Sequence, residues 1–118
     1  MTNMVLVLAV AAALQGEAGV LGPEGMTAVA DTMLARLSSP AFPNTWEGVL
    51  EGYYAREEPG SEAIAIAYAA VIHAWVPDGY VYAYSGEDCL KRNWREGDRV
   101  IRGSGHELHL ARSWPGGR

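Results

Sequence analysis

The feature of this sequence that most constrains its fold is a single glutamate between two apolar runs. Residues 4–14 contain no charged side chain, and a second apolar run follows the dipeptide Gly22-Pro23 and continues to Leu37. Glu17 therefore lies where two helices meet. A carboxyl group held against apolar walls resists ionisation, so we expect Glu17 to act as a general acid that keeps its proton near neutral pH.

The spacing of the apolar residues predicts that both runs are helices. Thr2 or Asn3 is a suitable N-cap for the first, which we expect to be a buried helix. The second should begin at Gly22-Pro23, because proline tolerates the first helical turn, and should end at the Ser-Ser-Pro sequence of residues 38–40. Its predicted core face comprises Met26, Val29, Ala30, Met33, Leu34 and Leu37.

Two further helices are predicted in the middle of the chain. After Pro43, Asn44 can cap a short helix together with Glu47, because this spacing lets each side chain satisfy the other's free backbone amide. Gly52 would end that helix. Ser61 is the cap candidate for a longer helix, whose apolar positions at helical spacing are Ile64, Ala67, Tyr68, Val71, Ile72 and Trp75.

The periodicity changes after the Pro-Asp-Gly sequence of residues 77–79, which is typical of a turn. Residues 80–84 alternate tyrosine with smaller apolar residues, and this alternation predicts a strand with Tyr80, Tyr82 and Tyr84 on one face. Core packing is the favoured explanation for at least one of these tyrosines. A polar loop, residues 85–97, is expected to follow the strand.

Two short strands are predicted near the C-terminus, at residues 100–101 and 107–110, with a glycine turn at 103–105 between them. The tail from Trp114 to Arg118 is expected to be mobile. Because helices come first and strands last, the sequence predicts an α+β domain.

Length and charge limit the class of protein. At 118 residues, 49% apolar and 19% charged, the chain has a soluble globular composition, and we expect one domain over residues 1–118 with its core at about 3–112. The net charge of −5 argues against nucleic-acid binding, which relies on clustered cations. The basic residues gather from Lys91 onward, and we interpret this region as a solvated loop.

A family resemblance rests on residues spread over nearly the whole chain. They are Glu17-Ala18, Glu24-Gly25, Ala28-Val29-Ala30, Arg36, Phe42-Pro43-Asn44-Thr45 and Gly48-Val49, followed more weakly by Trp94 and Gly105-His106. In residue type and spacing this pattern resembles the catalytic domain of the SleB-type cell wall hydrolases, the spore cortex-lytic enzymes. The resemblance implies a small lysozyme-like α+β domain, mainly helical first and with a short antiparallel sheet last. It also implies cleavage of peptidoglycan glycan strands by a lytic transglycosylase, with Glu17 as the catalytic glutamate.

The resemblance also suggests residues that contact or support the glycan. Tyr53 and Tyr54 occupy the region of a polar-aromatic pair that lines the family's groove, and the alternative for both is packing on the rim of the core. From the residues themselves, the same two explanations apply to Tyr80, Tyr82 and Tyr84, and Tyr82 is assigned to the substrate site. Trp94, in a polar loop, is assigned there too, with anchoring of the loop as its alternative. His106 matches a family histidine and is assigned to the substrate site, while Arg36 and Glu24 are assigned supporting roles. Glu24 also suits the first turn of its helix, where a negative charge complements the helix dipole. Asp31 lies on the side of the same helix away from the apolar stripe and is expected to be solvated.

A lytic transglycosylase needs only one carboxyl group. The acid protonates the leaving oxygen and then, as carboxylate, accepts the proton of the sugar's own C6 hydroxyl, whereas most glycosidases use two carboxylates. The first alternative is a hydrolytic muramidase. The second is a non-catalytic wall-binding or virion structural module, because Leu21 and Ala35 stand where the family has a second glutamate and an asparagine.

No metal or other cofactor is expected. His106 and His109 are three residues apart in a predicted strand, so their side chains point to opposite faces rather than to one ion. Cys89 is the only cysteine, which excludes an intramolecular disulfide.

The expected partner is the glycan strand of peptidoglycan, and a monomer is favoured. The basic C-terminal region could alternatively attract anionic wall polymers. Residues 4–14 are too short to cross a bilayer, and no Lys or Arg precedes them, so neither a membrane span nor a signal peptide is expected. The protein is expected to act at the bacterial cell wall as a phage-type lysin or virion component, or after release from the cytoplasm.

Overall fold

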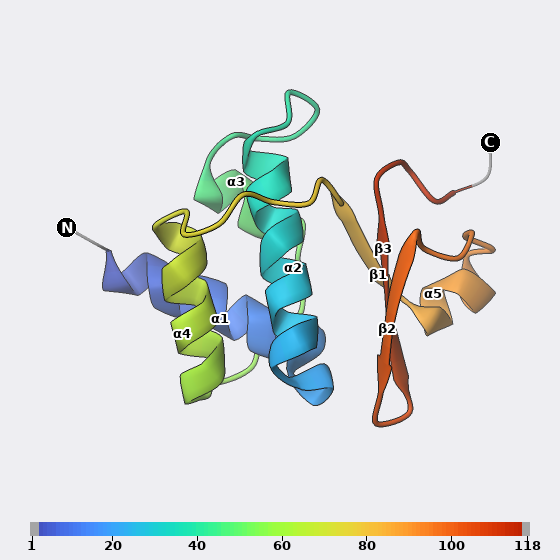
Figure 1. Cartoon of the computed structure of the whole chain (residues 1–118), viewed down its shortest axis with the longest axis horizontal. Coiled ribbons are helices and arrows are strands. Elements are labelled where there is room, and N and C mark those ends of the chain that lie inside the picture. Colours follow the sequence, from blue (N-terminus) through green and yellow to red (C-terminus); the bar gives the residue numbers. More distant parts are fainter. Residues whose placement is uncertain (1–2, 117–118) are drawn as a thin grey trace.

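The computed structural model describes residues 3–116 and consists of a helical part followed by a small sheet (Figure 1). The helical part contains α1 (Met4–Ala18), a 3-10 turn η1 (Gly19–Leu21), α2 (Gly22–Leu37), α3 (Trp46–Leu50) and α4 (Ser61–Val71). The second part contains β1 (Tyr82–Ser85), α5 (Gly86–Lys91), β2 (Arg99–Gly103) and β3 (His106–Ala111). The predicted α+β class is confirmed.

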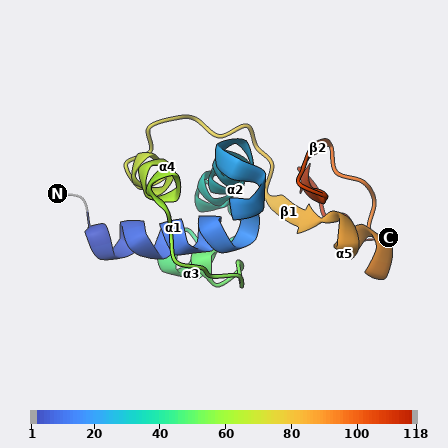
Figure 2. The ribbon, with the colours of Figure 1, turned by 90° about the horizontal axis from the view of Figure 1, so that it is seen from below.

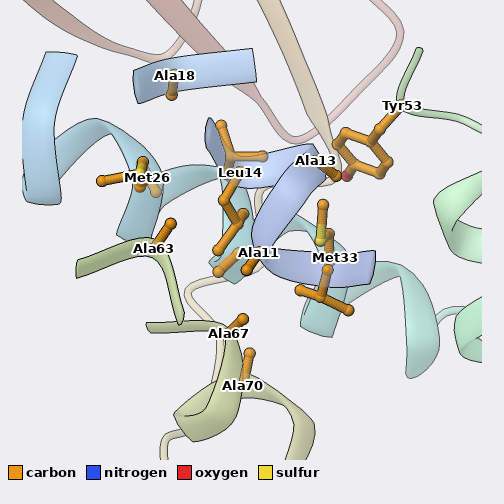
Figure 3. Close-up of a cluster of buried hydrophobic side chains, with 14 of the residues drawn as sticks. Ala11, Ala13, Leu14, Ala18, Met26, Met33, Tyr53, Ala63, Ala67 and Ala70 are labelled. Carbon is orange, nitrogen blue, oxygen red and sulfur yellow. The ribbon is translucent and has the colours of Figure 1, made fainter. Parts of the chain in front are cut away.

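Helix α1 is the central element of the core. Asn3 caps it by accepting hydrogen bonds from the amides of Val5 and Leu6, whereas the other predicted cap, Thr2, lies outside the described residues. Helices α2 and α4 pack across the same side of α1 (Figure 2). The side of α4 turned toward α1 carries the fully buried Ala63, Ala67 and Ala70, and such small side chains let the two helices approach closely (Figure 3).

The predicted core face of α2 is confirmed from Met26 to Leu34, while Leu37 is partly buried at the edge of the core. The prediction that Asp31 is solvated was wrong. Asp31 is only 8% exposed and accepts hydrogen bonds from Trp75 Nε1 at 2.8 Å and from the backbone amide of Asp78 at 3.1 Å. The segment after α4 covers this side of α2, so the polar face of α2 that carries Asp31 is also enclosed.

Two helix caps differ from the sequence prediction. Thr45, not Asn44, caps α3 by accepting a hydrogen bond from Gly48 N, while Asn44 donates to the carbonyls of Leu37 and Ser39. Helix α4 begins at Ser61, but its cap is Gly60, which makes no side-chain capping bond. The helix also ends at Val71, so that Trp75, beyond the end, is free to reach Asp31.

The strands form an antiparallel sheet in the order β1-β3-β2, with Tyr84 paired to His109 and Ile101 to Leu108. The turn at residues 103–105 is confirmed, and Gly105 adopts a φ of 75° there, which favours glycine. Leu108 and Leu110 join the same apolar cluster as the helices. The sheet is therefore packed on the helical part through one continuous core.

The predicted loop at residues 85–97 was wrong in its first half, which forms α5. Ser85 and Asp88 make a reciprocal capping box, in which Asp88 N donates to Ser85 Oγ and Ser85 N donates to Asp88 Oδ2. The prediction of a mobile tail was also wrong for residues 114–116. The Trp114 ring packs edge-on against Tyr82 and Trp94, and the Pro115 carbonyl accepts a hydrogen bond from Arg95 N.

The helical run Met4–Leu37 is long and apolar enough, by length and composition, to cross a membrane. It consists of α1, η1 and α2, which pack against each other, and α1 alone has 15 residues where a span needs about 20. Core helices of soluble proteins and signal sequences share this property, so it assigns no location to the chain.

Candidate active site

A cavity of about 420 Å³ lies where the helical part meets the sheet. It contains six of the residues that the sequence analysis assigned to the site: Glu17, Arg36, Tyr53, Tyr54, Tyr82 and Trp94. The other lining residues are Gly52, Ala83, Tyr84, Asp88, Arg92, Trp114 and Pro115. The fold thus brings together side chains from α1, α2, the loop after α3, β1, α5 and the C-terminal segment.

Glu17 lies in the last turn of α1 and is half-buried. Its Oε2 accepts a hydrogen bond of 3.1 Å from the backbone amide of Ala55, which fixes the direction of the carboxyl group. Its Oε1 has no hydrogen-bond partner among residues 3–116, and no polar side-chain atom in that part of the chain is both buried and unpaired. Oε1 is therefore accessible to solvent and available to a bound molecule.

The segment that holds Glu17 runs alongside α1. Glu57 N donates to the Ala12 carbonyl at 3.1 Å, and Gly60 N donates to Gln15 Oε1 at 3.0 Å. A Cβ atom at Gly16 would lie 2.6 Å from the carbonyl carbon of Ala55, so only glycine allows this close approach. The loop and the helix end together form one wall of the cavity.

Arg36, near the end of α2, is held by aromatic rings. Its guanidinium carbon lies 4.5 Å from the ring centre of Phe42 and 4.9 Å from that of Tyr53. Its Nε donates a hydrogen bond of 2.7 Å to the Val81 carbonyl. These contacts connect α2 to the strand that forms the opposite wall of the cavity.

Tyr53 is buried, and its hydroxyl points into the core. Thr32 donates its single hydroxyl proton to the Val29 carbonyl. In the 2.7 Å hydrogen bond between the Tyr53 hydroxyl and Thr32 Oγ1, Tyr53 is therefore the donor. Burial raises the pKa of Tyr53 above its ordinary value. Its position suits support of Arg36 rather than a hydrogen bond to a sugar, whereas the neighbouring Tyr54 is 88% exposed and lines the cavity.

The sheet side of the cavity is an aromatic wall formed by Tyr82, Tyr84, Trp94 and Trp114. The rings pack edge-on against one another. The ring centre of Trp94 lies 5.4 Å from that of Tyr84 and 5.1 Å from that of Trp114, and the ring centres of Trp114 and Tyr82 are 5.5 Å apart. Tyr82 and Tyr84 share one face of β1, as the alternation predicted, but Tyr80, the third tyrosine of that prediction, lies before the strand. Tyr84 and Trp114 were not among the predicted site residues, and no local pattern around Trp114 indicates its position.

Asp88 is a second acidic residue in the cavity that the sequence analysis missed. Its Oδ2 accepts hydrogen bonds from Ser85, and its Oδ1 forms an ion pair of 3.2 Å with Arg92. Both oxygens are therefore engaged. The spacing of Ser85 and Asp88, typical of a capping box, is the signal that could have predicted this helix start.

His106 and Glu24 do not line this cavity. His106 is exposed and borders a different cavity of about 720 Å³ beside α5 and β3. Glu24 forms an exposed ion pair of 3.6 Å with Arg99. The two departures from the family pattern also lie outside the cavity wall, because Leu21 packs on the core and Ala35 is buried.

His109 lies behind the aromatic wall, where its ring stacks on Tyr84. It is buried, unlike His106. Its Nδ1 accepts a hydrogen bond from Gly97 N, so Nε2 carries the proton and donates to Glu107 Oε1 at 2.9 Å. This bond and that from Arg102 hold the pKa of Glu107 below its ordinary value. No group of three or more His, Cys, Asp or Glu side chains suited to a metal ion occurs within residues 3–116.

Comparison with known proteins identifies the fold. No family model matches the sequence, and no curated protein matches it. The chain is similar to the catalytic domain of the Bacillus cereus SleB protein, with a TM-score of 0.60, 23% identity and 92% of each chain covered. It is also similar to the catalytic domain of the germination-specific lytic transglycosylase SleB from Bacillus anthracis, with a TM-score of 0.62 and 25% identity over 92% of this chain and 96% of that one. The predicted resemblance to the SleB catalytic domain is confirmed.

Proposed function

We propose that this SleB-like domain is an enzyme that cleaves the glycan strands of peptidoglycan as a lytic transglycosylase. The likeness to the SleB lytic transglycosylase of Bacillus anthracis supports the substrate class. The observation that carries the reaction type is the contrast between the two acidic residues in the cavity. Glu17 has one accessible oxygen, while both oxygens of Asp88 are engaged by Ser85 and Arg92.

The reaction requires one group that first gives and then takes a proton. Protonated Glu17 donates its proton to the glycosidic oxygen, and the C1–O bond breaks with its electron pair on the leaving sugar. The C6 hydroxyl oxygen of the remaining sugar then bonds to C1, and its proton passes to the Glu17 carboxylate. The product is an anhydro-sugar, no water is consumed, and the acid is regenerated.

The cavity walls suit the binding of a sugar chain. Tyr54 and the aromatic wall offer ring faces and edges against which pyranose rings can pack, and they lie on opposite parts of the structure. The amide of Ala55 keeps the carboxyl group of Glu17 in one orientation beside that space. Such positioning favours proton transfer, because a general acid must lie within hydrogen-bond reach of the leaving oxygen.

A hydrolytic muramidase is the second candidate, and the presence of Asp88 in the cavity favours it. A hydrolase would need Asp88 to activate water, and for this Asp88 would have to leave Arg92 and the cap of α5. The non-catalytic alternative rested on Leu21 and Ala35. Neither residue lines the cavity, so these departures leave its walls complete.

Mass analysis of the products from purified sacculi tests the proposal. The wild-type protein should release anhydro-muramoyl fragments, each lighter by one water than the hydrolytic product. Glu17→Gln keeps the side-chain shape without a transferable proton and should reduce the release by about 10²- to 10⁴-fold. Hydrated products would instead support the muramidase, and equal activity of a folded Glu17→Gln protein would exclude Glu17 as the acid.

A further inference from the structure

Arg36 presents unused hydrogen-bond donors to the cavity that contains Glu17. Its Nε is bonded to the Val81 carbonyl, but its terminal nitrogens Nη1 and Nη2 make no hydrogen bond to any residue in the range 3–116. No ion pair in that range includes Arg36. Four N–H groups of a half-buried cation are thus left for a bound molecule.

Within residues 3–116 most other arginines are engaged by carboxylates or by several carbonyls, whereas Arg112 has one hydrogen bond to the Asp78 carbonyl and a contact with the Tyr80 ring. Arg92, Arg95, Arg99 and Arg102 each form an ion pair with a carboxylate. Arg56 donates to the backbone carbonyls of Leu50, Tyr53 and Ala55. The contrast matters because a charge taken partly out of water is costly unless it is paired, and Arg36 has only ring faces and one hydrogen bond to a backbone carbonyl to offset that cost.

The guanidinium of Arg36 is held in place before any ligand binds. The rings of Phe42 and Tyr53 flank it, and Tyr82 lies at 5.7 Å. The absence of a side chain at Gly52 also leaves room for it, since a Cβ atom there would lie 2.5 Å from Nη1. A planar fork with fixed donors matches the two oxygens of a carboxylate.

The geometry points to Arg36 as the binding site for a carboxylate on the glycan strand, in the same cavity as Glu17. This inference rests on the proposed function. Muramic acid residues carry a lactyl ether whose carboxyl group is either free or joined to a stem peptide with carboxylates of its own, whereas the alternating N-acetylglucosamine residues carry none. A carboxylate site in the cavity therefore places the muramic residue in one position and decides which of the two alternating glycosidic bonds faces Glu17.

Charge in the cavity supports this assignment. The chain has a net charge of −5, and Glu17 and Asp88 both line the cavity. Asp88 is already paired with Arg92, so Arg36 is the cation left to offset an incoming anion. Without Arg36, the only cation among residues 3–116 lining the cavity would be Arg92, whose charge is already offset by Asp88.

The test compares glycan strands that differ only in their carboxylates. Strands stripped of stem peptides carry free lactyl carboxylates, and coupling them to methylamine makes the same strands neutral. Peptide-bearing strands, with and without the same coupling, form the second pair and reveal whether the lactyl group or the peptide supplies the carboxylate. The measured quantities are kcat/KM for anhydro-product release and the dissociation constant of each strand.

The wild-type protein should prefer the charged member of at least one pair by about 10- to 100-fold, the range expected for charge-assisted hydrogen bonds. Arg36→Gln should abolish that preference by lowering kcat/KM more on the charged strand than on the neutral one, because the lost bond to the Val81 carbonyl affects both strands alike. Arg36→Lys should keep part of it. Gly52→Ala displaces the Arg36 guanidinium without removing its charge and should reduce the preference for the charged strand. Lys91→Gln is the control for the loss of one positive charge outside the cavity.

Equal losses on charged and neutral strands in Arg36→Gln would overturn the inference and leave the proposed function intact. If the wild-type protein cleaves none of these glycan strands, the proposed function fails. The dissociation constants of the charged and neutral strands still decide whether Arg36 selects a carboxylate. Thermal unfolding of each variant separates these outcomes from a loss of folded protein.

Discussion

The backbone amide of Ala55 donates a hydrogen bond of 3.1 Å to the Glu17 carboxylate, although the two residues are 38 positions apart in the sequence. The bond joins the end of α1 to the loop that follows α3. The orientation of the proposed acid therefore depends on a close contact between two segments, and Gly16 is the residue that permits this contact.

Gly16→Ala should therefore reduce both stability and activity. The added Cβ would meet backbone atoms of Ala55 and Arg56 at 2.6 Å, and neither can move without shifting the loop. We expect a loss of about 1–3 kcal/mol in the free energy of unfolding, which exceeds the gain of about 0.5–1 kcal/mol from alanine in a helix. Urea unfolding measures it. Gly60→Ala is the matched control, because its Cβ would meet only the Gln15 side chain at 3.6 Å.

Tyr54→Ala should lower kcat/KM on glycan strands without changing stability. The side chain is highly exposed and lines the cavity, so its removal costs contact with the sugar but little with the protein. An aromatic contact of about 0.5–1.5 kcal/mol corresponds to a loss of about 2- to 12-fold. Tyr68→Ala removes an exposed tyrosine of α4 outside the cavity and should change neither quantity. An unchanged kcat/KM in Tyr54→Ala would remove Tyr54 from the substrate site.

Asp88→Asn should leave the anhydro-product as the main product and keep activity within a few-fold of the wild type. Its cost is structural, because the capping box of α5 and the ion pair with Arg92 are both weakened. We expect a loss of about 0.5–1.5 kcal/mol in the free energy of unfolding. Measurement of product mass together with thermal unfolding separates the two effects. Loss of all cleavage by a folded Asp88→Asn protein would contradict the single-acid reaction.

Tyr53 should make the protein less stable in alkaline solution. Burial raises the pKa of Tyr53 above its ordinary value of 10.0, so above about pH 10 the unfolded chain releases the phenolic proton while the folded chain retains it. The folded state then binds more protons, and the free energy of unfolding falls as pH rises, by at most about 1.4 kcal/mol per pH unit from this group.

Denaturant unfolding at a series of pH values between about 9 and 11 measures this slope. Tyr53→Phe should make the slope shallower, while at neutral pH it should cost about 1 kcal/mol for the lost hydrogen bond to Thr32. Identical slopes for the two proteins would show that Tyr53 ionises alike in the folded and unfolded chains.

Local patterns predicted most of the secondary structure. The apolar spacing from Met26 to Leu34, the alternation of Tyr82 and Tyr84 and the turn before Gly105 each depend on neighbours within a few residues. The missed helix α5 also had a local signal in Ser85 and Asp88. No local signal indicated that Asp31 is buried, because Trp75, which covers it, is 44 positions away in the sequence.

The sequence by itself determined where the helices and strands form and that one glutamate stands between two apolar helices, because hydrogen bonding and one-sided burial repeat over short distances. Only the tertiary structure decided what surrounds that glutamate. It brought Trp114 from the C-terminal segment into the aromatic wall, engaged Asp88 with Arg92 and left the fork of Arg36 free. These relationships arise when distant segments pack on a shared core, and no short stretch of sequence contains them.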